Sequence, residues 1–249
     1  MLDYLIIGGG IAGISAAARL SEYGATLVLE AEAHLAYHTS GRSAALYEQN
    51  YGSRSTVALA KAARADFDGM LSGVLSPRGF LLVCLQGEEA QFEYDLEHMH
   101  LSEIAVADAA KLVPILNSSS VIRTASSTTA HDIDTDMMLQ IFTRQIRANS
   151  GTVETNQQVT AINKTKRGWR VATESGQYEA QKIVNAAGAW GDEIAQMAGL
   201  PKIGLTPFRR SVARLSAPGG HAVQSWPMLF GPGERWYAKP DAGGLIVSL

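Results

Sequence analysis

Apolar and polar positions near the start of the chain follow the order strand, helix, strand. Residues 4–7 form a short apolar run bounded by glycines, which is typical of a buried parallel strand. From residue 11 to residue 23, small and apolar residues recur at helical spacing, and Gly24 stands where a helix commonly ends. Residues 26–29 form a second aliphatic run that ends at Glu30. The three segments fit within about 30 residues, the size of one βαβ unit.

The middle of the chain predicts mostly helices. Residues 31–52 are irregular and polar, and residues 79–85 read as a strand. Residues 117–129 are rich in Ser and Thr and read as a loop with an edge strand. Thr135 is expected to cap the fourth predicted helix. The predicted helices cover residues 53–71, 88–98, 107–112 and 134–148.

The second half predicts an antiparallel meander. Its strands are expected at residues 152–155, 158–164, 168–173 and 177–179, with turns at Arg167-Gly168 and Ser175-Gly176. A further strand at residues 182–185, a helix at 192–198 and three or four strands after residue 205 follow. Residues 243–249 read as a strand that no turn signal terminates, so we expect the chain to be cut there.

Composition changes this picture little. The chain has 249 residues, 46% of them hydrophobic and 18% charged, which is ordinary for a globular enzyme and argues against disorder. Its net charge of −3 argues against a nucleic-acid partner. The single cysteine, Cys84, excludes an internal disulfide and fits a reducing compartment. The apolar stretch 5–20 is too short and too broken by glycines for a transmembrane segment. We expect a cytoplasmic protein; peripheral contact with the inner membrane face stays open.

The first loop carries the clearest chemistry. In Gly8-Gly9-Gly10-Ile11-Ala12-Gly13, the first glycine allows a tight turn, Gly10 lets a pyrophosphate approach the backbone, and Gly13 lets helix and strand pack closely. The N–H groups of the first helical turn would then face the phosphates. Glu30 can accept both hydroxyls of a ribose and would repel a 2′-phosphate. The loop therefore predicts an adenine dinucleotide, but it does not decide between NAD and FAD.

Two turns of small residues lie further along, at residues 38–45 and 184–190. Arg42 in the first could pair with the pyrophosphate, and the small residues after it leave room for a flat ring system. No metal site is expected, because the six histidines lack the Glu-x-x-His spacing of metal-binding helices. A serine hydrolase is not expected either, because no G-x-S-x-G motif is present.

Seven segments together resemble the D-amino acid oxidase superfamily of FAD enzymes, most closely the bacterial D-arginine dehydrogenase and D-amino acid dehydrogenase-like proteins. They run in family order from end to end of the chain: IIGGGIAGISAA, LVLEAEA, HTSGRSAALY, DIDTDMML, VNAAGAWGDEIA, PFRRS and WYAKPDAGG. The resemblance implies an α/β fold with a discontinuous, Rossmann-like FAD-binding domain at residues 1–45 and 130–204. An α+β substrate domain with a large antiparallel sheet would occupy residues 46–129 and 205–249. It also implies that this second domain lacks roughly the last third of the family's length, so that the chain could bind FAD poorly.

The resemblance also implies roles for individual residues. Those facing the substrate would be Tyr51, Arg210 and Tyr237. Those holding FAD would be Gly8, Gly10, Ile11, Ala12, Gly13, Glu30, Ala31, Arg42, Ser43, Ala44, Ala45, Val159, Ala187, Gly188 and Trp190.

The implied reaction is oxidative deamination of a D-amino acid, with hydride transfer to flavin N5 giving an imino acid. Phe80 and Leu46 stand where D-arginine-preferring relatives carry a carboxylate and a histidine, so we expect a neutral or hydrophobic substrate side chain. Glycine, sarcosine or a hydroxy acid is an alternative substrate. A non-catalytic or split flavoprotein subunit that needs a second chain is an alternative of another class. The electron acceptor (a quinone, a dye or oxygen) stays open.

Overall fold

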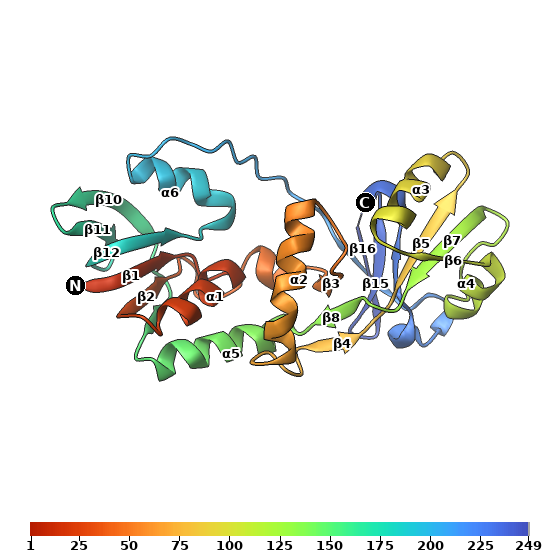
Figure 1. Ribbon diagram of the computed structural model, residues 1–249, viewed down its shortest axis with the longest axis horizontal. Coiled ribbons are helices and arrows are strands. Elements are labelled where there is room, and N and C mark those ends of the chain that lie inside the picture. The colour runs from red at the N-terminus through yellow and green to blue at the C-terminus, as the bar shows by residue number, and fades with distance from the viewer. Residues whose placement is uncertain (249) are drawn as a thin grey trace. The chain divides into compact units, whose positions relative to one another are not determined.

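A computed structural model describes residues 1–248, and the chain divides into two compact units, each built from two stretches (Figure 1). Unit 1 comprises residues 1–43 and 135–208, and unit 2 comprises residues 44–134 and the chain from residue 209 onward. The divisions lie at 43/44, 134/135 and 208/209, where the sequence led us to expect 45/46, 129/130 and 204/205. Both units are therefore discontinuous in sequence.

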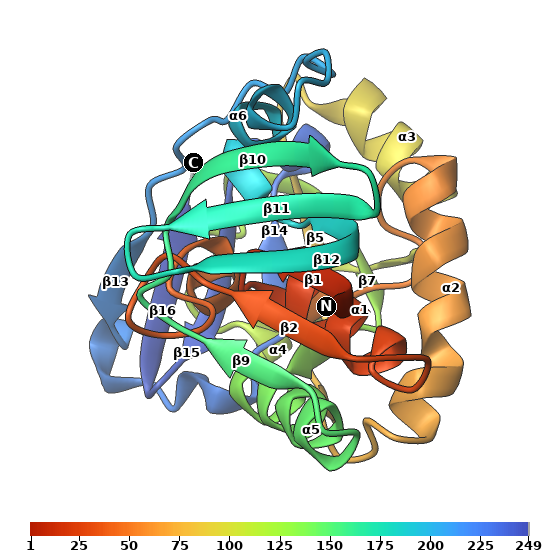
Figure 2. The ribbon, with the colours of Figure 1, turned by 90° about the vertical axis from the view of Figure 1, so that its left-hand side faces the viewer.

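Unit 1 is built on a six-stranded sheet with the order β10-β11-β12-β1-β2-β9, which Figure 2 shows from one side. The strands β12, β1, β2 and β9 run parallel, and β10, β11 and β12 form an antiparallel meander. The strands are β1 Leu2–Ile7, β2 Thr26–Leu29, β9 Thr152–Glu154, β10 Val159–Thr165, β11 Gly168–Thr173 and β12 Gln177–Asn185.

Helices cover the sheet of unit 1 because its strands are apolar on both faces. Helix α1 (Ile11–Leu20) packs on β1 and β2 and against α5 (Thr135–Ala148), and it buries Ile14 and Ala17 completely. Helix α6 (Gly191–Met197) contacts β10 and β12, and its Ile194 joins a buried cluster with Leu5 and Leu29. The carboxyl ends of β1 and β2 thus open onto the glycine loop and Glu30.

Three expectations for unit 1 were wrong in detail. The strand β9 does not belong to the meander, because it pairs in parallel with β2 at the opposite edge of the sheet. The two strands expected at 177–179 and 182–185 are the single strand β12, which pairs with β11 along its first half and with β1 over most of its length. Helix α5 begins at Thr135 itself, so this residue is the first of the helix rather than its cap.

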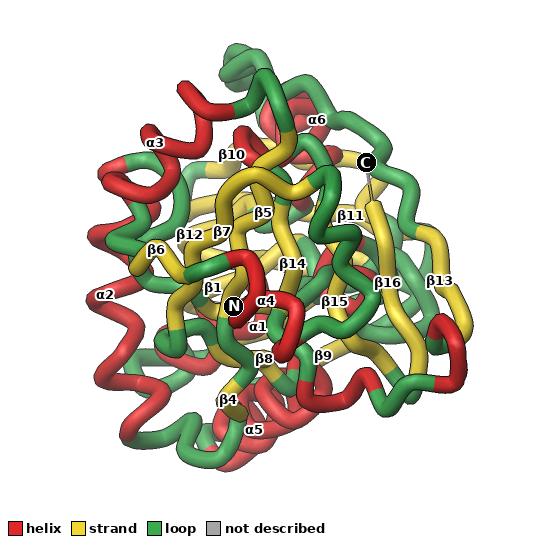
Figure 3. Tube along the Cα trace, turned by 90° about the vertical axis from the view of Figure 1, so that its right-hand side faces the viewer, coloured by secondary structure: helices red, strands yellow, loops and turns green. Residues whose placement is uncertain are grey.

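Unit 2 contains a seven-stranded sheet with the order β13-β16-β15-β14-β5-β7-β6 (Figure 3) and a small sheet β3-β8-β4. The large sheet is antiparallel except between β14 and β5. Its strands are β5 Phe80–Leu85, β6 Ser102–Ile104, β7 Val121–Ser127, β13 Ala213–Ser216, β14 Met228–Phe230, β15 Tyr237–Asp241 and β16 Gly244–Ser248. The small sheet has β3 Leu46–Tyr47, β4 Leu75–Pro77 and β8 His131–Ile133. The helices are α2 Arg54–Asp68, α3 Glu89–His98 and α4 Val106–Leu112.

The strand β7 corrects the expectation of an edge strand within residues 117–129. It lies between β5 and β6, and the short β6, which the sequence analysis missed, is the edge. The strand expected at residues 243–249 is β16, which pairs with β13 and β15 over its described residues. Residue 249 lies outside the described residues.

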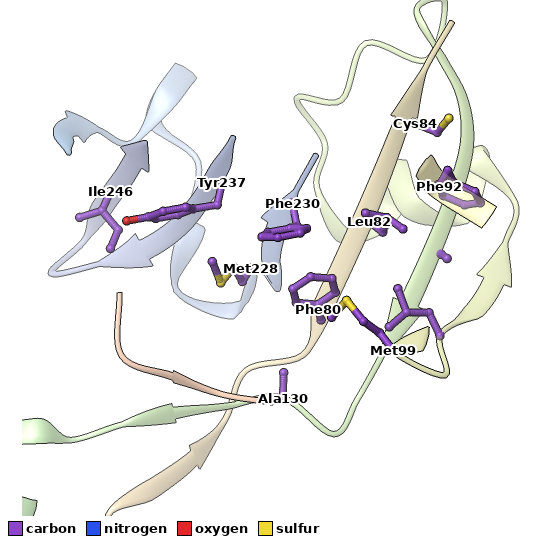
Figure 4. Close-up of a cluster of buried hydrophobic side chains, with 12 residues drawn as sticks. Phe80, Leu82, Cys84, Phe92, Met99, Ala130, Met228, Phe230, Tyr237 and Ile246 are labelled. Atoms are coloured by element: carbon purple, nitrogen blue, oxygen red, sulfur yellow. The ribbon is translucent and has the colours of Figure 1, made fainter. Parts of the chain in front are cut away.

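The core of unit 2 on one side of the sheet is a cluster that we call the Phe80 cluster. Phe80, Leu82 and Cys84 alternate along β5 and point to the same face, as Figure 4 shows. The cluster consists of Phe80, Leu82, Cys84, Phe92, Met99, Leu101, Ala125, Ala130, Met228, Phe230, Tyr237 and Ile246.

A partly buried group of charges ties the small sheet of unit 2 to the large one. Asp132 on β8 accepts a hydrogen bond from Arg78 Nε at 2.8 Å and another from Lys239 Nζ at 2.8 Å. The Arg78 guanidinium also donates to the carbonyl oxygens of Gln224 and Trp226. Lys239 is 7% exposed, so its charge relies on this carboxylate for compensation.

Candidate functional site

The glycine loop between β1 and α1 has no room for side chains at Gly8 and Gly13. A Cβ on Gly13 would lie 1.8 Å from the carbonyl oxygen of Gly8, and a Cβ on Gly8 would lie 2.3 Å from that of Ala186. Gly8 also has φ +113°, which favours glycine. A Cβ on Gly10, by contrast, would have only Ser40 Oγ within 4 Å, at 3.1 Å. The loop therefore packs tightly underneath and leaves its outer side open to a ligand.

Glu30 lies at the end of β2 and turns its carboxylate back to the loop. Its Oε2 accepts a hydrogen bond from the Gly9 N–H at 2.6 Å, and its Oε1 accepts one from the Glu32 N–H at 2.9 Å. A carboxylate has about four acceptor positions, so two remain for further donors. The side chain is buried and held in one place, and it can accept the two hydroxyls of a ribose. This arrangement fits the adenosine half of a dinucleotide.

Ser40 is a feature of the loop that the sequence analysis did not single out. The segment after β2 returns to the glycines, where Ala36 N–H donates to the carbonyl oxygen of Gly9 at 3.1 Å. There Ser40 Oγ accepts a hydrogen bond from Ile11 N–H at 2.9 Å, at the first turn of α1. Its own O–H can then donate to a phosphate oxygen. No local pattern predicts this contact, because it depends on how the segment 31–42 folds back.

Aromatic and charged side chains of the same segment meet the turn after β12. The rings of His38 and Trp190 lie 4.6 Å apart, and His38 Nε2 lies 2.9 Å from Glu32 Oε1. The guanidinium of Arg42 lies 4.8 Å from the ring centroid of Tyr37. Arg42 and Trp190 are 148 residues apart in sequence. Arg42 contacts Tyr37 and Trp190 contacts the next residue, His38, so the two turns of small residues lie close together.

The remaining expected cofactor residues fall into two groups. Ala31, Ser43, Ala187 and Gly188 lie in unit 1, and Val159 at the start of β10 is buried in one cluster with Leu29. The chain just before β10 is attached to the end of β2, because Gln157 N–H donates to the carbonyl oxygen of Glu30 at 2.8 Å. Ala44 and Ala45 belong to unit 2, where Ala44 packs against the Phe80 cluster.

The three expected substrate residues come together in unit 2. Tyr51 lies edge-on to Phe230, with ring centroids 6.1 Å apart, and Phe230 pairs with Tyr237 across β14 and β15. The guanidinium of Arg210 lies 6.0 Å from the ring centroid of Tyr237. A cation and two phenols therefore lie near one another, with Tyr237 in the Phe80 cluster and Tyr51 packed against it. Such a set can bind a carboxylate, because guanidinium and hydroxyl groups both donate to its oxygens.

Tyr51 is neutral at ordinary pH. Burial raises its pKa above the usual value near 10, and the hydrogen bond from its hydroxyl to the Glu234 carboxylate raises the pKa further, while Arg210 lowers it. Glu234 was not expected at this site. It ends the turn Pro232–Glu234 with φ +60°, and the sequence Pro-Gly-Glu predicts the turn but not the direction of the carboxylate.

Phe80 belongs to the same apolar cluster as Tyr237, and Leu46 packs against that cluster, as Tyr51 does. Phe80 is 2% exposed and its ring lies 5.2 Å from that of Phe230, while Leu46 packs partly buried against the same cluster. Phe80 is therefore part of the apolar core rather than of an exposed surface. Phe80 supports Tyr51 and Tyr237 through Phe230.

Metal sites and membrane-spanning helices are both absent from the described part of the chain. In residues 1–248, no group of three or more His, Cys, Asp or Glu side chains could hold a metal ion. Within the same residues, no helix is long and apolar enough to cross a membrane.

Comparisons with known proteins give the family and the fold of this chain. The sequence profile of the family described as FAD dependent oxidoreductase, DAO, matches residues 3–248. Among solved structures, L-proline dehydrogenase from P. horikoshii is similar with a TM-score of 0.83 and 21% identity, over 99% of this chain and 68% of that one. Glycine oxidase from Bacillus cereus ATCC 14579 gives 0.82 and 18%, over 100% and 70%. L-amino acid deaminase from Proteus vulgaris gives 0.74 and 14%, over 100% and 60%.

Proposed function

Because the chain belongs to the FAD-dependent oxidoreductase (DAO) family and its cofactor is accordingly FAD, we propose that it oxidises a D-amino acid with a neutral or hydrophobic side chain to the imino acid. The observation that carries this proposal is the position of Arg210 beside Tyr51 and Tyr237, above an apolar core. A carboxylate binder of this kind suits an amino acid.

In this proposal unit 1 holds the cofactor. The glycine loop and the Ser40 hydroxyl receive the pyrophosphate, Glu30 accepts the ribose hydroxyls, and Arg42 leaves Tyr37 to pair with a phosphate. Trp190 and His38 close the same side of the loop. When bound, FAD accepts a hydride from the substrate Cα.

The side chains of unit 2 orient the substrate. The planar Arg210 guanidinium pairs with both carboxylate oxygens, and Tyr51, whose hydroxyl donates its one proton to Glu234, lies beside it as a neutral ring. Tyr237 packs beneath the guanidinium and limits its movement. Positioning of this kind can contribute several kcal/mol to the rate, since it holds the Cα–H bond in the reactive direction. The neutral amine nitrogen supplies the lone pair that forms the C=N bond, and the resulting iminium loses a proton to water to give the imino acid.

The preference for an uncharged side chain rests on the apolar support of this site. Phe230 lies directly against Tyr51, and Leu46 and Phe80 pack behind it. An unpaired cation beside such a surface would cost several kcal/mol. Glu234 is already engaged by the Tyr51 hydroxyl, so pairing a cationic side chain there would give up that hydrogen bond.

The decisive experiment is anaerobic reduction of the protein's flavin by a panel of substrates. D-methionine, D-leucine and D-arginine are compared with their L-enantiomers, and loss of flavin absorbance is followed. We expect fast bleaching by the neutral D-amino acids and slow bleaching by D-arginine. A clear preference for D-arginine would disprove the side-chain assignment, and bleaching by L-enantiomers alone would disprove the D-configuration.

The same assay separates two alternatives. Faster bleaching by glycine, sarcosine or a 2-hydroxy acid than by any D-amino acid would indicate another substrate of the same reaction class. A flavoprotein subunit that acts only with a second chain is favoured by exposed apolar side chains, since Ile203 is 81% and Phe208 is 89% exposed. Such a subunit would bind FAD without being bleached by any of these compounds.

A further inference from the structure

Glu48 is a buried carboxylate that the cofactor and substrate assignments do not use. It follows the last residue of β3 and is 7% exposed. Its Oε1 accepts a hydrogen bond from the Asn50 N–H at 3.1 Å, and its Oε2 accepts one from the Thr129 hydroxyl at 2.9 Å. Both donors are neutral groups, so these bonds give the carboxylate no ion pair. Since glutamate is seldom buried unless it is paired, this arrangement indicates a role other than packing.

The bonds of Glu48 fix the turn that carries Tyr51. The backbone carbonyl oxygen of Glu48 accepts the Tyr51 N–H at 3.2 Å, so its side chain and its backbone together hold the residues that follow it. The bond from Thr129 attaches this turn to the loop between β7 and β8. Just before the turn, β3 pairs with β8, where Tyr47 lies opposite His131. The turn is therefore held from within and from its neighbouring loop, by residues that all belong to unit 2.

The Tyr51 side chain depends on this turn for its place in the substrate site. Its ring lies edge-on to Phe230, with centroids 6.1 Å apart, and packs against the Phe80 cluster. Its hydroxyl donates to the Glu234 carboxylate, and Arg210 is close enough to lower the pKa of this hydroxyl. Tyr51 belongs to neither a helix nor a strand, so the regular hydrogen bonds of such elements do not fix its backbone. The bonds to Glu48 therefore determine where the ring starts.

We propose that Glu48 is a positioning residue of the substrate site: by fixing the turn at residues 48–51, it holds the Tyr51 ring beside Arg210. This inference rests on the proposed function, in which Tyr51 and Arg210 form the site for the substrate carboxylate. Glu48 itself touches neither substrate nor cofactor in this role. Its loss weakens carboxylate binding because Tyr51 then samples more positions, of which few complete the site.

The restraint itself is tested by hydrogen exchange of the turn, which needs no activity. In Glu48→Ala we expect the amides of Asn50 and Tyr51 to exchange about tenfold faster or more, because the Asn50 N–H loses its acceptor and the turn opens at lower cost. In Glu48→Gln the side-chain oxygen can still accept from Asn50, and the amide group can donate to the Thr129 hydroxyl. Rates within about threefold of the unsubstituted protein are therefore expected for Glu48→Gln. Unchanged exchange in Glu48→Ala would overturn the inference.

Thr129→Val is a milder variant that keeps the test valid if Glu48→Ala does not fold. It removes the hydroxyl that binds Glu48 from an exposed side chain. Because the bond between the turn and the neighbouring loop is then lost, exchange at Asn50 and Tyr51 should rise about threefold or more. Thr128→Val is the matched control, since Thr128 is the exposed neighbour in the same loop. Equal exchange rates in the two threonine variants would contradict the inference.

The effect on the substrate site is tested by a double-mutant cycle with Tyr51. Propionate, a carboxylate without the amine, is titrated calorimetrically into the flavin-loaded protein, Glu48→Ala, Tyr51→Ala and the double variant. We expect each single change to weaken binding about fivefold and the double variant to bind like Tyr51→Ala alone, because Glu48 acts only through Tyr51. A Glu48→Ala effect of the same size in the Tyr51→Ala background would show a general structural effect and overturn the proposal. Failure of Glu48→Gln to restore binding would also overturn it, since the charge rather than the hydrogen bonds would then be responsible.

Turnover separates the failure of this inference from that of the proposed function. With D-amino acids, Glu48→Ala should raise KM about fivefold and change kcat little, and Glu48→Gln should restore most of the loss. Propionate binding that depends on Glu48 through Tyr51, without turnover of any amine, would disprove the proposed reaction and leave the positioning role intact. Normal propionate binding by Glu48→Ala would disprove the positioning role and leave the reaction intact.

Discussion

Arg210 is the residue on which substrate binding is expected to depend most. Its guanidinium can form two parallel hydrogen bonds to a carboxylate, which a leucine side chain cannot replace. We expect Arg210→Leu to raise KM for the amino acid at least about tenfold, the loss that charge-assisted hydrogen bonds typically cause. Steady-state kinetics with the best D-amino acid measures it.

Arg209 supplies the control for this prediction. It is the preceding residue, it carries the same charge, and it is likewise exposed. Arg209→Leu should change KM less than about twofold, because general attraction between the protein and an anionic substrate is screened by salt. Equal losses in the two variants would show that overall positive charge, rather than a carboxylate clamp at Arg210, is what matters.

Single residues differ in how far the sequence could predict their surroundings. Glu30 could be connected with the glycine loop, because the βαβ unit brings the end of its second strand back to its first turn. The contacts of Ser40 and Glu234 could not be predicted. Ser40 reaches Ile11 across 29 residues of chain, and Glu234 meets Tyr51 from a distant turn. Irregular loops carry no periodic pattern from which such contacts follow.

The junction of β1 and α1 has no room for a side chain at Gly13. A methyl group at Gly13 would lie 1.8 Å from a backbone oxygen, so helix and strand must separate to admit it. We expect Gly13→Ala to cost about 1–3 kcal/mol or more of the stability of unit 1 and to lower its FAD content. Thermal unfolding and the ratio of flavin to protein absorbance measure the two effects.

Gly176→Ala is the comparison for that variant. Gly176 lies in the turn between β11 and β12, where the atoms nearest to a Cβ would be those of the Tyr178 phenol, at 3.8 Å or more. Its φ is not in the left-handed region, so alanine is tolerated there. An equal loss of stability and FAD in both variants would show that glycine content, rather than the close helix–strand contact, is responsible.

Elements were predictable where their own pattern is strong. The strand at residues 26–29 was expected at the bounds it has, because four buried positions in a row end at a glutamate. The three-residue β9 was assigned to the wrong partner, since so short a strand carries no information about which neighbour it pairs with. The strand β12 was divided in two because alternating polar residues such as Glu179 and Gln181 interrupt its apolar pattern.

At the scale of the whole molecule, each unit contains its own buried core and joins two distant stretches of chain. No shift of composition marks the divisions at 43/44, 134/135 and 208/209. Their approximate places followed from resemblance to a family rather than from local pattern, because a division depends on long-range contacts. Two cores within one chain raise the question of whether they unfold together or separately.

Cys84 can answer this question because it is the only cysteine and lies fully buried in unit 2. Burial raises the pKa of Cys84, and Glu89 and Glu88 add to the effect. An unfolded thiol has a pKa of about 8.5, so the native thiol is still neutral at the pH at which the unfolded thiol begins to ionise. The buried neutral thiol therefore makes its full contribution to the free energy of unfolding below about pH 8.5, and this contribution is lost as pH rises through the folded pKa. At about pH 8, where an unfolded thiol has begun to ionise, labelling by a thiol reagent reports the opening of unit 2.

We expect the two units to unfold separately. Leu82→Ala removes a fully buried side chain beside Cys84 at a cost of about 2–5 kcal/mol, so labelling should accelerate more than about tenfold. Gly13→Ala weakens unit 1, and labelling should stay within about twofold of the unsubstituted protein. All three proteins must react at the same rate in denaturant, which controls for the reagent. Acceleration by Gly13→Ala equal to that by Leu82→Ala would instead show one cooperative unit, in which loss of the dinucleotide loop also opens the sheet that carries Tyr237.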